Sequence, residues 1–111
     1  AELAALLRRL GGTPEDILES PEILGLLQPL LAADFQVNEV YSYRAGPRLP
    51  IPITAFPSTH DQFASLDQVA GWHDETEASY TQLVLEGNHF AIFDHAPTVL
   101  AHIAAHLRPY C

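Results

Sequence analysis

Two short apolar runs decide the fold: PIPITAF at residues 50–56 and YTQLVL at residues 80–85. Both are rich in the β-branched and aromatic residues that favour strands. Roughly two dozen residues separate them, and SLDQ at residues 65–68 matches a capping box that begins a helix ending near residue 75. Two strands joined by a connection of this length that contains a helix form a βαβ unit, so we expect the strands to be parallel.

Helical patterns lie on both sides of this unit. Residues 97–107 place apolar side chains on one side of a helix, and residues 2–10 carry leucines at the spacing i, i+3, i+4, i+7. The apolar stretch from Ile23 to Tyr41 predicts a long helix with an unusually broad apolar face, which Pro29 is expected to kink or split. The chain therefore begins with helices and continues with strand, helix, strand and helix.

Two hydroxyl–proline pairs mark helix starts in the first part of the chain. In Thr13-Pro14 and in Ser20-Pro21 the hydroxyl residue suits the N-cap and the proline suits the first helical position. We expect one short helix after the first pair and the long helix after the second.

A cluster of helix and strand breakers, AGPRLP at residues 45–50, coincides with the change of pattern. We therefore expect a helical region at residues 1–43 and a βαβα region at residues 44–111. Two parallel strands alone do not form a stable sheet, so these strands are expected to belong to a larger parallel sheet. The chain starts with alanine and contains no methionine, and we expect it to be part of a longer polypeptide that holds the other strands.

Composition limits the function. The chain has 111 residues, 48% apolar and 17% charged, which suits one small globular domain. Fourteen acidic and five basic residues produce a net charge of −9, so we expect no nucleic acid partner and no membrane surface partner, because both require clustered cations. Cys111 has no second cysteine to pair with, and no signal peptide pattern is present, so we expect a cytoplasmic protein.

Two loops are candidates for chemistry because each follows a predicted strand. In an open parallel sheet, reactive side chains gather beyond the carboxyl ends of the strands. PSTHDQ at residues 57–62 and EGNHF at residues 86–90 occupy such positions. A carboxylate and an imidazole on adjacent strand ends can meet as two members of a catalytic triad. A loop histidine is more often a surface or core residue, so the residues alone leave both interpretations open.

Several further runs resemble a known family, in the same order and over nearly the whole chain. These runs are LRRLGGTP (7–14), ADF (33–35), EVYSYR (39–44), PITA (52–55), Trp72 with Thr76, and GNHF (87–90). With them, the chain is similar to the C-terminal half of type II thioesterases, stand-alone α/β-hydrolases that serve polyketide and nonribosomal peptide synthases.

This resemblance implies a fold and a set of roles. Residues 44–111 would be the C-terminal portion of an α/β-hydrolase core, with parallel strands and crossover helices, and residues 1–43 its helical lid. In the family the triad order is serine, aspartate, histidine. His89 falls on the family's histidine motif and would be the general base, and Asp61 would be the acid that orients it. His60, beside Asp61, is expected at the surface.

The resemblance also implies a substrate and partners. The substrate would be an acyl group on the phosphopantetheine of a carrier protein, and no metal or diffusible cofactor would be required. Leu27, Leu31 and Phe35 of the lid are our candidates for the wall of an acyl channel. His102 and His106 have the i, i+4 spacing of a metal pair, but no carboxylate or thiolate completes a set on their helix, so we expect a polar stripe.

The nucleophile is the element that the chain does not supply. The family's serine lies in a G-x-S-x-G elbow, and none of the five serines has that context (Ser20, Ser42, Ser58, Ser65 and Ser79). We therefore expect the 111 residues alone to be inactive, with the serine in the missing N-terminal half of the hydrolase. The alternatives are a non-catalytic α/β-hydrolase-like interaction module, which the absent serine favours, and another α/β-hydrolase that acts as an esterase.

Overall fold

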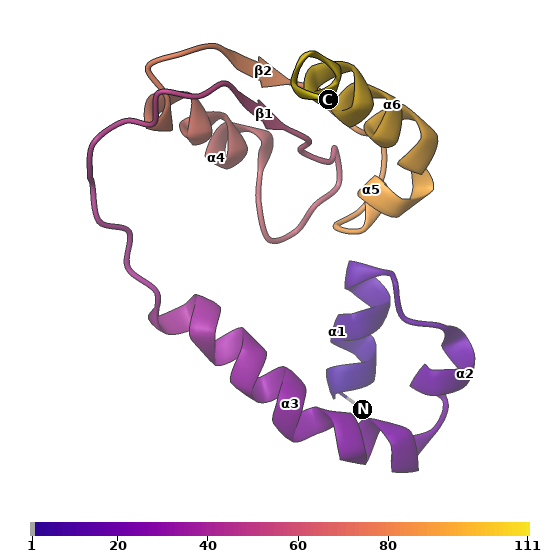
Figure 1. The fold of residues 1–111 in the computed structure, drawn as a ribbon. Coiled ribbons are helices and arrows are strands. Elements are labelled where there is room, and N and C mark those ends of the chain that lie inside the picture. The colour runs from indigo at the N-terminus through magenta and orange to yellow at the C-terminus, as the bar shows by residue number, and fades with distance from the viewer. Residues whose placement is uncertain (1) are drawn as a thin grey trace. The chain divides into compact units, whose positions relative to one another are not determined.

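The helices of the first part of the chain form a unit of their own. The computed structural model describes residues 2–111, and it divides the chain into one unit that ends at Pro47 and a second that spans Arg48–Cys111 (Figure 1). The first unit contains α1 (Glu2–Leu10), α2 (Glu15–Leu18) and α3 (Pro21–Val40).

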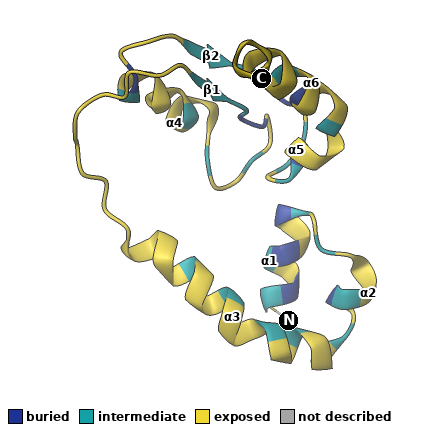
Figure 2. Ribbon diagram, in the orientation of Figure 1, coloured by how far each residue is buried: buried dark blue, intermediate teal, exposed yellow. Residues whose placement is uncertain are grey.

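Leucines at helical spacing form the small core of this first unit. Ala4, Leu7 and Leu10 lie on one side of α1 and are buried, as is Leu18 of α2. They appear as the dark blue segments of these helices in Figure 2. Because α1 contacts both α2 and α3, the apolar stripe predicted for residues 2–10 is the face on which the unit packs.

The two hydroxyl–proline pairs differ in their outcome. The Ser20 hydroxyl accepts a hydrogen bond from the Ile23 amide at 3.3 Å, so the predicted N-cap of α3 is confirmed. The N-cap predicted at Thr13 is wrong by one residue. Pro14 is itself the N-cap, because its ψ of 145° is extended, and the helix begins at Glu15.

Pro29 does not split α3, which continues for 20 residues to Val40. A proline removes one backbone donor, and the leucine and alanine residues that follow it are strong helix formers that continue the ladder. None of the residues of α3, all of which the structure describes, is buried. Its half-buried positions form one stripe: Leu24, Leu27, Leu31 and Phe35.

A parallel pair of strands lies at the centre of the second unit, as predicted. The strands β1 (Ile53–Ala55) and β2 (Tyr80–Gln82) pair in parallel with Ile53 opposite Tyr80. The crossover contains α4 (Leu66–Ala70), with the predicted capping box between Ser65 and Gln68, followed by the 3₁₀ helix η1 (Gly71–Glu75).

Both strands are shorter than the apolar runs that predicted them. Pro50 and Pro52 have no amide proton for the ladder, so regular pairing starts only at Ile53. Single bridges extend the pairing at either end, between Leu49 and Thr76 and between Ser58 and Leu85.

The last part of the chain is helical. It contains α5 (Ala91–Asp94), α6 (Ala96–Leu107) and the 3₁₀ helix η2 (Arg108–Tyr110). Leu85, Ala91 and Val99 form the buried cluster of this unit, and the half-buried Phe56 packs against it. The core therefore lies directly behind the two loops that leave the carboxyl ends of the strands.

Large apolar side chains remain exposed in the second unit. Trp72 is 54% exposed, and it lines a pocket beside β1 together with Val69. Leu100 and Leu107 of α6 are also exposed, so of the apolar side predicted for that helix only Val99 is buried in the part of the chain that the structure describes. None of the helices within residues 2–111 is long and apolar enough to span a bilayer.

Candidate active site

The parallel register brings the two candidate loops to the same edge of the strand pair. The pairing of β1 with β2 continues to the bridge between Ser58 and Leu85, and the Thr59 amide then donates to the Leu85 carbonyl at 2.9 Å. The His60 amide also donates to the Gly87 carbonyl at 2.8 Å, and the two segments then continue as the loop with Asp61 and the loop with His89. Both side chains therefore start from a paired backbone only a few residues away.

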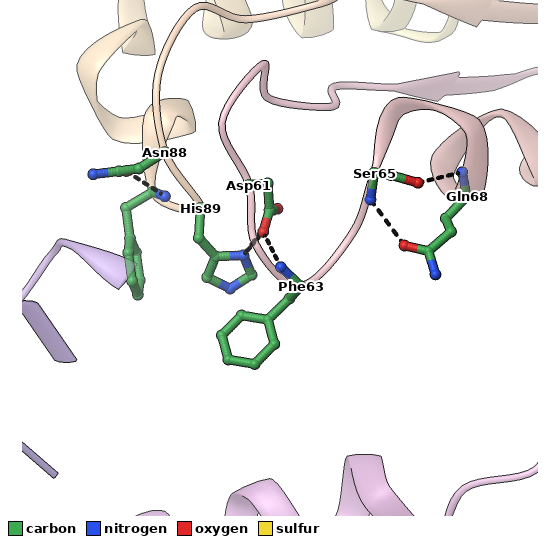
Figure 3. A network of polar contacts seen from close by, with 7 residues as sticks. Asp61, Phe63, Ser65, Gln68, Asn88 and His89 are labelled. Carbon is green, nitrogen blue, oxygen red and sulfur yellow. Dashed lines mark hydrogen bonds and ion pairs between the residues drawn. The ribbon is translucent and has the colours of Figure 1, made fainter. Parts of the chain in front are cut away.

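Asp61 and His89 meet side chain to side chain (Figure 3). Nδ1 of the His89 ring lies 3.1 Å from Oδ1 and 3.0 Å from Oδ2 of Asp61. The Asp61 side chain is 11% exposed and the His89 side chain is 40% exposed. With Nδ1–H donated to the carboxylate, Nε2 is the ring nitrogen left to accept a proton from a reacting group.

The Asp61 carboxylate is held in its ionised form. Partial burial alone raises its pKa, but hydrogen bonds from the His89 ring and from the amides of Phe63 and Ala64 outweigh it, and the pKa lies below the usual value. The Phe63 amide donates to Oδ1 at 2.8 Å. An ionised, nearly buried carboxylate can hold the imidazole in one tautomer and stabilise the imidazolium that forms when Nε2 takes a proton.

Two aromatic rings pack edge to face on the His89 ring. The centroid of Phe63 lies 5.2 Å from it and that of Phe90 lies 5.1 Å from it. Such packing restricts rotation of the imidazole and keeps Nδ1 turned toward Asp61. Phe90 is in turn held by Asn88, whose side-chain oxygen accepts from the Phe90 amide at 2.8 Å.

The backbone before His89 requires a glycine. Gly87 has a φ of +138°, a region that side-chain-bearing residues rarely adopt. A Cβ added there would lie 3.0 Å from the Cβ of Ala91. This tight turn directs the chain from the buried Leu85 back toward Asp61.

The other histidine next to the site has a different environment. His60 is 73% exposed along its side chain, and its Nδ1 lies 2.9 Å from the Thr59 hydroxyl and 3.7 Å from the Glu86 carboxylate. Its ring is therefore engaged with these groups, as expected of a surface residue beside the site.

The structure also identifies residues around the site that the sequence does not single out. The Thr59 hydroxyl accepts from the Gly87 amide at 3.1 Å, and the Nε2–H of His95 donates to the Glu86 carbonyl at 2.8 Å. Both fasten the loop that carries His89. Only their nearness to Asp61 and His89 in the sequence could have suggested them, because such contacts leave no spacing pattern.

The candidate channel residues lie on the first unit, along the half-buried stripe of α3 that contains Leu27, Leu31 and Phe35. On α6, the rings of His102 and His106 pack with centroids 4.2 Å apart, and Nδ1 of His106 donates to the His102 carbonyl. Within residues 2–111, no group of three or more His, Cys, Asp or Glu side chains is arranged to hold a metal ion.

Comparison with known proteins assigns the chain to a family. The model of the thioesterase domain family matches residues 1–107, which is nearly the whole chain. The chain belongs to the thioesterase domain family. The resemblance drawn from the sequence motifs is thus confirmed.

Relatives of this thioesterase chain include a gramicidin S biosynthesis protein and a second thioesterase. It is 30% identical to the gramicidin S biosynthesis protein GrsT of Aneurinibacillus migulanus over 92% of this chain and 40% of that protein. It is 33% identical to the thioesterase PikA5 of Streptomyces venezuelae over 93% of this chain and 37% of that protein. The thioesterase chain therefore spans about two fifths of the length of these relatives.

A solved structure agrees with the fold. The type II thioesterase BorB from the borrelidin biosynthetic cluster superimposes with a TM-score of 0.81 at 33% identity, over 96% of this chain and 43% of that chain. The prediction that the thioesterase chain is a portion of an α/β-hydrolase fold is confirmed.

Proposed function

We propose that this thioesterase chain supplies the aspartate and histidine of a Ser-Asp-His triad that hydrolyses acyl groups from the phosphopantetheine of carrier proteins. The observation that supports the proposal most directly is the contact between both Asp61 oxygens and Nδ1 of His89 at 3.0–3.1 Å. It leaves Nε2 available, which is the arrangement that a general base requires.

The reaction follows from these positions. A serine hydroxyl attacks the thioester carbonyl while Nε2 of His89 takes its proton, and the imidazolium then gives that proton to the departing pantetheine thiol. Water, deprotonated by the same nitrogen, hydrolyses the acyl-serine and regenerates the serine. Asp61 remains ionised throughout, which its lowered pKa favours. Thioester hydrolysis of this kind requires no metal and no diffusible cofactor.

The nucleophile comes from polypeptide outside these 111 residues in this proposal. None of the five serines of the chain lies in a G-x-S-x-G context. The serine elbow and the backbone amides of the oxyanion hole would both belong to the N-terminal half of the hydrolase. The 111-residue chain alone is accordingly expected to be inactive.

In this proposal the helical unit binds the acyl chain. Leu27, Leu31 and Phe35 share one face of α3 and are half-buried, so they offer a continuous apolar surface to a hydrocarbon chain. Long helices with apolar residues on more than one side suit a lid that repacks around different acyl groups.

The carrier protein would dock without help from overall charge. The net charge of −9 repels an acidic partner. Docking therefore depends on a local patch or on apolar contact.

The test replaces His89 in the complete protein. His89→Ala is expected to lower kcat for an acyl-pantetheine thioester by about three to six orders of magnitude and to leave the protein folded. His106→Ala removes an exposed imidazole that lies away from the site, on α6. It is the matched control and should keep full activity.

The possible outcomes separate the candidate functions. Near wild-type thioester hydrolysis by His89→Ala would remove this histidine from the mechanism. A wild-type protein that hydrolyses no acyl ester or thioester would favour the non-catalytic interaction module. Faster hydrolysis of simple oxygen esters than of acyl-pantetheine thioesters would identify another α/β-hydrolase esterase.

A further inference from the structure

A threonine hydroxyl joins the two loops of the site. Oγ1 of Thr59 lies 3.1 Å from the Gly87 amide, which donates to it. Thr59 comes two residues before Asp61, and Gly87 comes two residues before His89. The hydroxyl therefore joins the two loops at matching positions, each two residues before the side chain that takes part in the carboxylate–imidazole contact.

We propose that Thr59 is a positioning residue, whose hydroxyl holds the loop that carries His89 in the place where the ring meets Asp61. The inference rests on the catalytic role proposed for that pair. Thr59 acts through the backbone of Gly87 and makes no contact with the reacting atoms itself.

The backbone at this point needs such a restraint. Glycine has the largest conformational freedom of any residue, and Gly87 adopts its φ of +138° between a buried leucine and the catalytic histidine. Two backbone hydrogen bonds hold one side of the turn, from the Thr59 amide to the Leu85 carbonyl and from the His60 amide to the Gly87 carbonyl. The Thr59 hydroxyl satisfies the amide of Gly87, which these two bonds leave unengaged.

The geometry of the hydroxyl suits this task. Thr59 is β-branched, which restricts its χ1 and keeps Oγ1 in place. The hydroxyl oxygen accepts from Gly87, and its proton has an acceptor in Nδ1 of His60 at 2.9 Å when that nitrogen is unprotonated. The hydroxyl thus accepts one hydrogen bond and donates another, both with groups of these two loops.

Replacement of the side chain separates its role from that of the backbone. Thr59→Val keeps the shape and the backbone hydrogen bonds but removes the acceptor, whereas Thr59→Ser keeps the acceptor. Because Thr59 is exposed, water can solvate the freed Gly87 amide, so stability should change little. The loss should instead appear as a wider spread of His89 positions.

The experiment measures kcat, KM, melting temperature and the NMR signal of the His89 Nδ1 proton in the complete protein. Small misplacements of catalytic groups cost up to about a hundredfold in rate. We expect Thr59→Val to lower kcat by at least about tenfold with KM within about twofold, and to broaden or shift the Nδ1 proton signal. Thr59→Ser should restore both. Thr98→Val, at an exposed threonine on α6, is the control and should match the wild type.

The outcomes distinguish this inference from the function on which it rests. Wild-type kcat and an unchanged Nδ1 signal in Thr59→Val, alongside an inactive His89→Ala, would overturn the positioning role alone. A fall in kcat that follows a fall in melting temperature and is not restored by serine would also overturn it, because the role would be structural. An active His89→Ala would overturn the proposed function, whereas a changed Nδ1 signal in Thr59→Val would still support the restraint.

Discussion

Gly87→Ala tests whether the turn before His89 has the backbone that the structure assigns to it. Two costs add at this position. A side-chain-bearing residue at a φ of +138° is strained by about 1–3 kcal/mol. The new Cβ would also lie 3.0 Å from the Cβ of Ala91, where ordinary contacts begin at 3.4 Å.

The second cost cannot be avoided by a flexible neighbour. Ala91 is 0% exposed and belongs to the cluster with Leu85 and Val99. Its Cβ has no rotamer to change, so α5 or the loop must shift by a few tenths of an ångström. Overpacking of this kind costs about 1 kcal/mol or more. Together the two costs predict a loss of about 2–4 kcal/mol of unfolding free energy.

The assay combines thermal unfolding with turnover of an acyl-pantetheine thioester by the complete protein. The loss corresponds to a melting temperature about 5–15 °C lower. We expect kcat to fall by about a hundredfold at a temperature where the variant is folded, because a shifted loop moves His89 away from its productive position.

Two further variants identify the source of the effect. Gly71→Ala is the matched control, because Gly71 has a φ of −58° and no atom within 4 Å of an added Cβ. It should be neutral or stabilising by up to about 1 kcal/mol. Adding Ala91→Gly to Gly87→Ala removes the contact but not the strain, so it should recover only part of the loss. A Gly87→Ala variant as stable and active as Gly71→Ala would refute the reasoning.

Two predictions concern the Asp61 carboxylate and Leu31 of α3. The folded state lowers the pKa of Asp61 below its ordinary value of 3.8, so the ionised group stabilises the fold fully above that pH and the contribution is lost as the pH falls through the lowered pKa. The melting temperature of the wild type should therefore exceed that of Asp61→Asn by a constant margin at neutral pH and approach it below pH 3.8; a margin that is unchanged down to pH 2 would contradict the stabilised carboxylate. Leu31→Trp should slow hydrolysis of long acyl thioesters more than that of acetyl or propionyl thioesters, because the larger side chain narrows a distal channel. An equal loss on every chain length with a lower melting temperature would show that Leu31 is ordinary core.

Local patterns were sufficient to predict most of the elements. Leucine spacing predicts α1, and the side chains of Ser65 and Gln68 define the start of α4, because both signals depend on residues within one helical turn. Where the prediction at Thr13 and the predicted start of β1 are wrong, the prolines decide. Their fixed φ and missing amide proton move the start of a helix or strand by one to three residues.

The pair Asp61 and His89 could be predicted only in part. The order of strands and loops, together with the family resemblance, identifies Asp61 and His89, because the parallel crossover places both loops at one edge. The distances of 3.0–3.1 Å between them depend on contacts that no sequence pattern indicates, namely the edge-to-face rings of Phe63 and Phe90 and the amide that Phe63 donates to the carboxylate.

The sequence by itself determined the helices and the parallel pairing, since periodicity, capping and chain order are properties of neighbouring residues, and the family resemblance of its motifs pointed to Asp61 and His89. Only the tertiary structure decided how those residues are held. The Thr59 hydroxyl on the Gly87 amide joins residues 28 positions apart, and the Phe63 ring of one loop packs on the His89 ring of the other. Contacts of this kind arise when separate segments pack together, so no local spacing in the sequence encodes them.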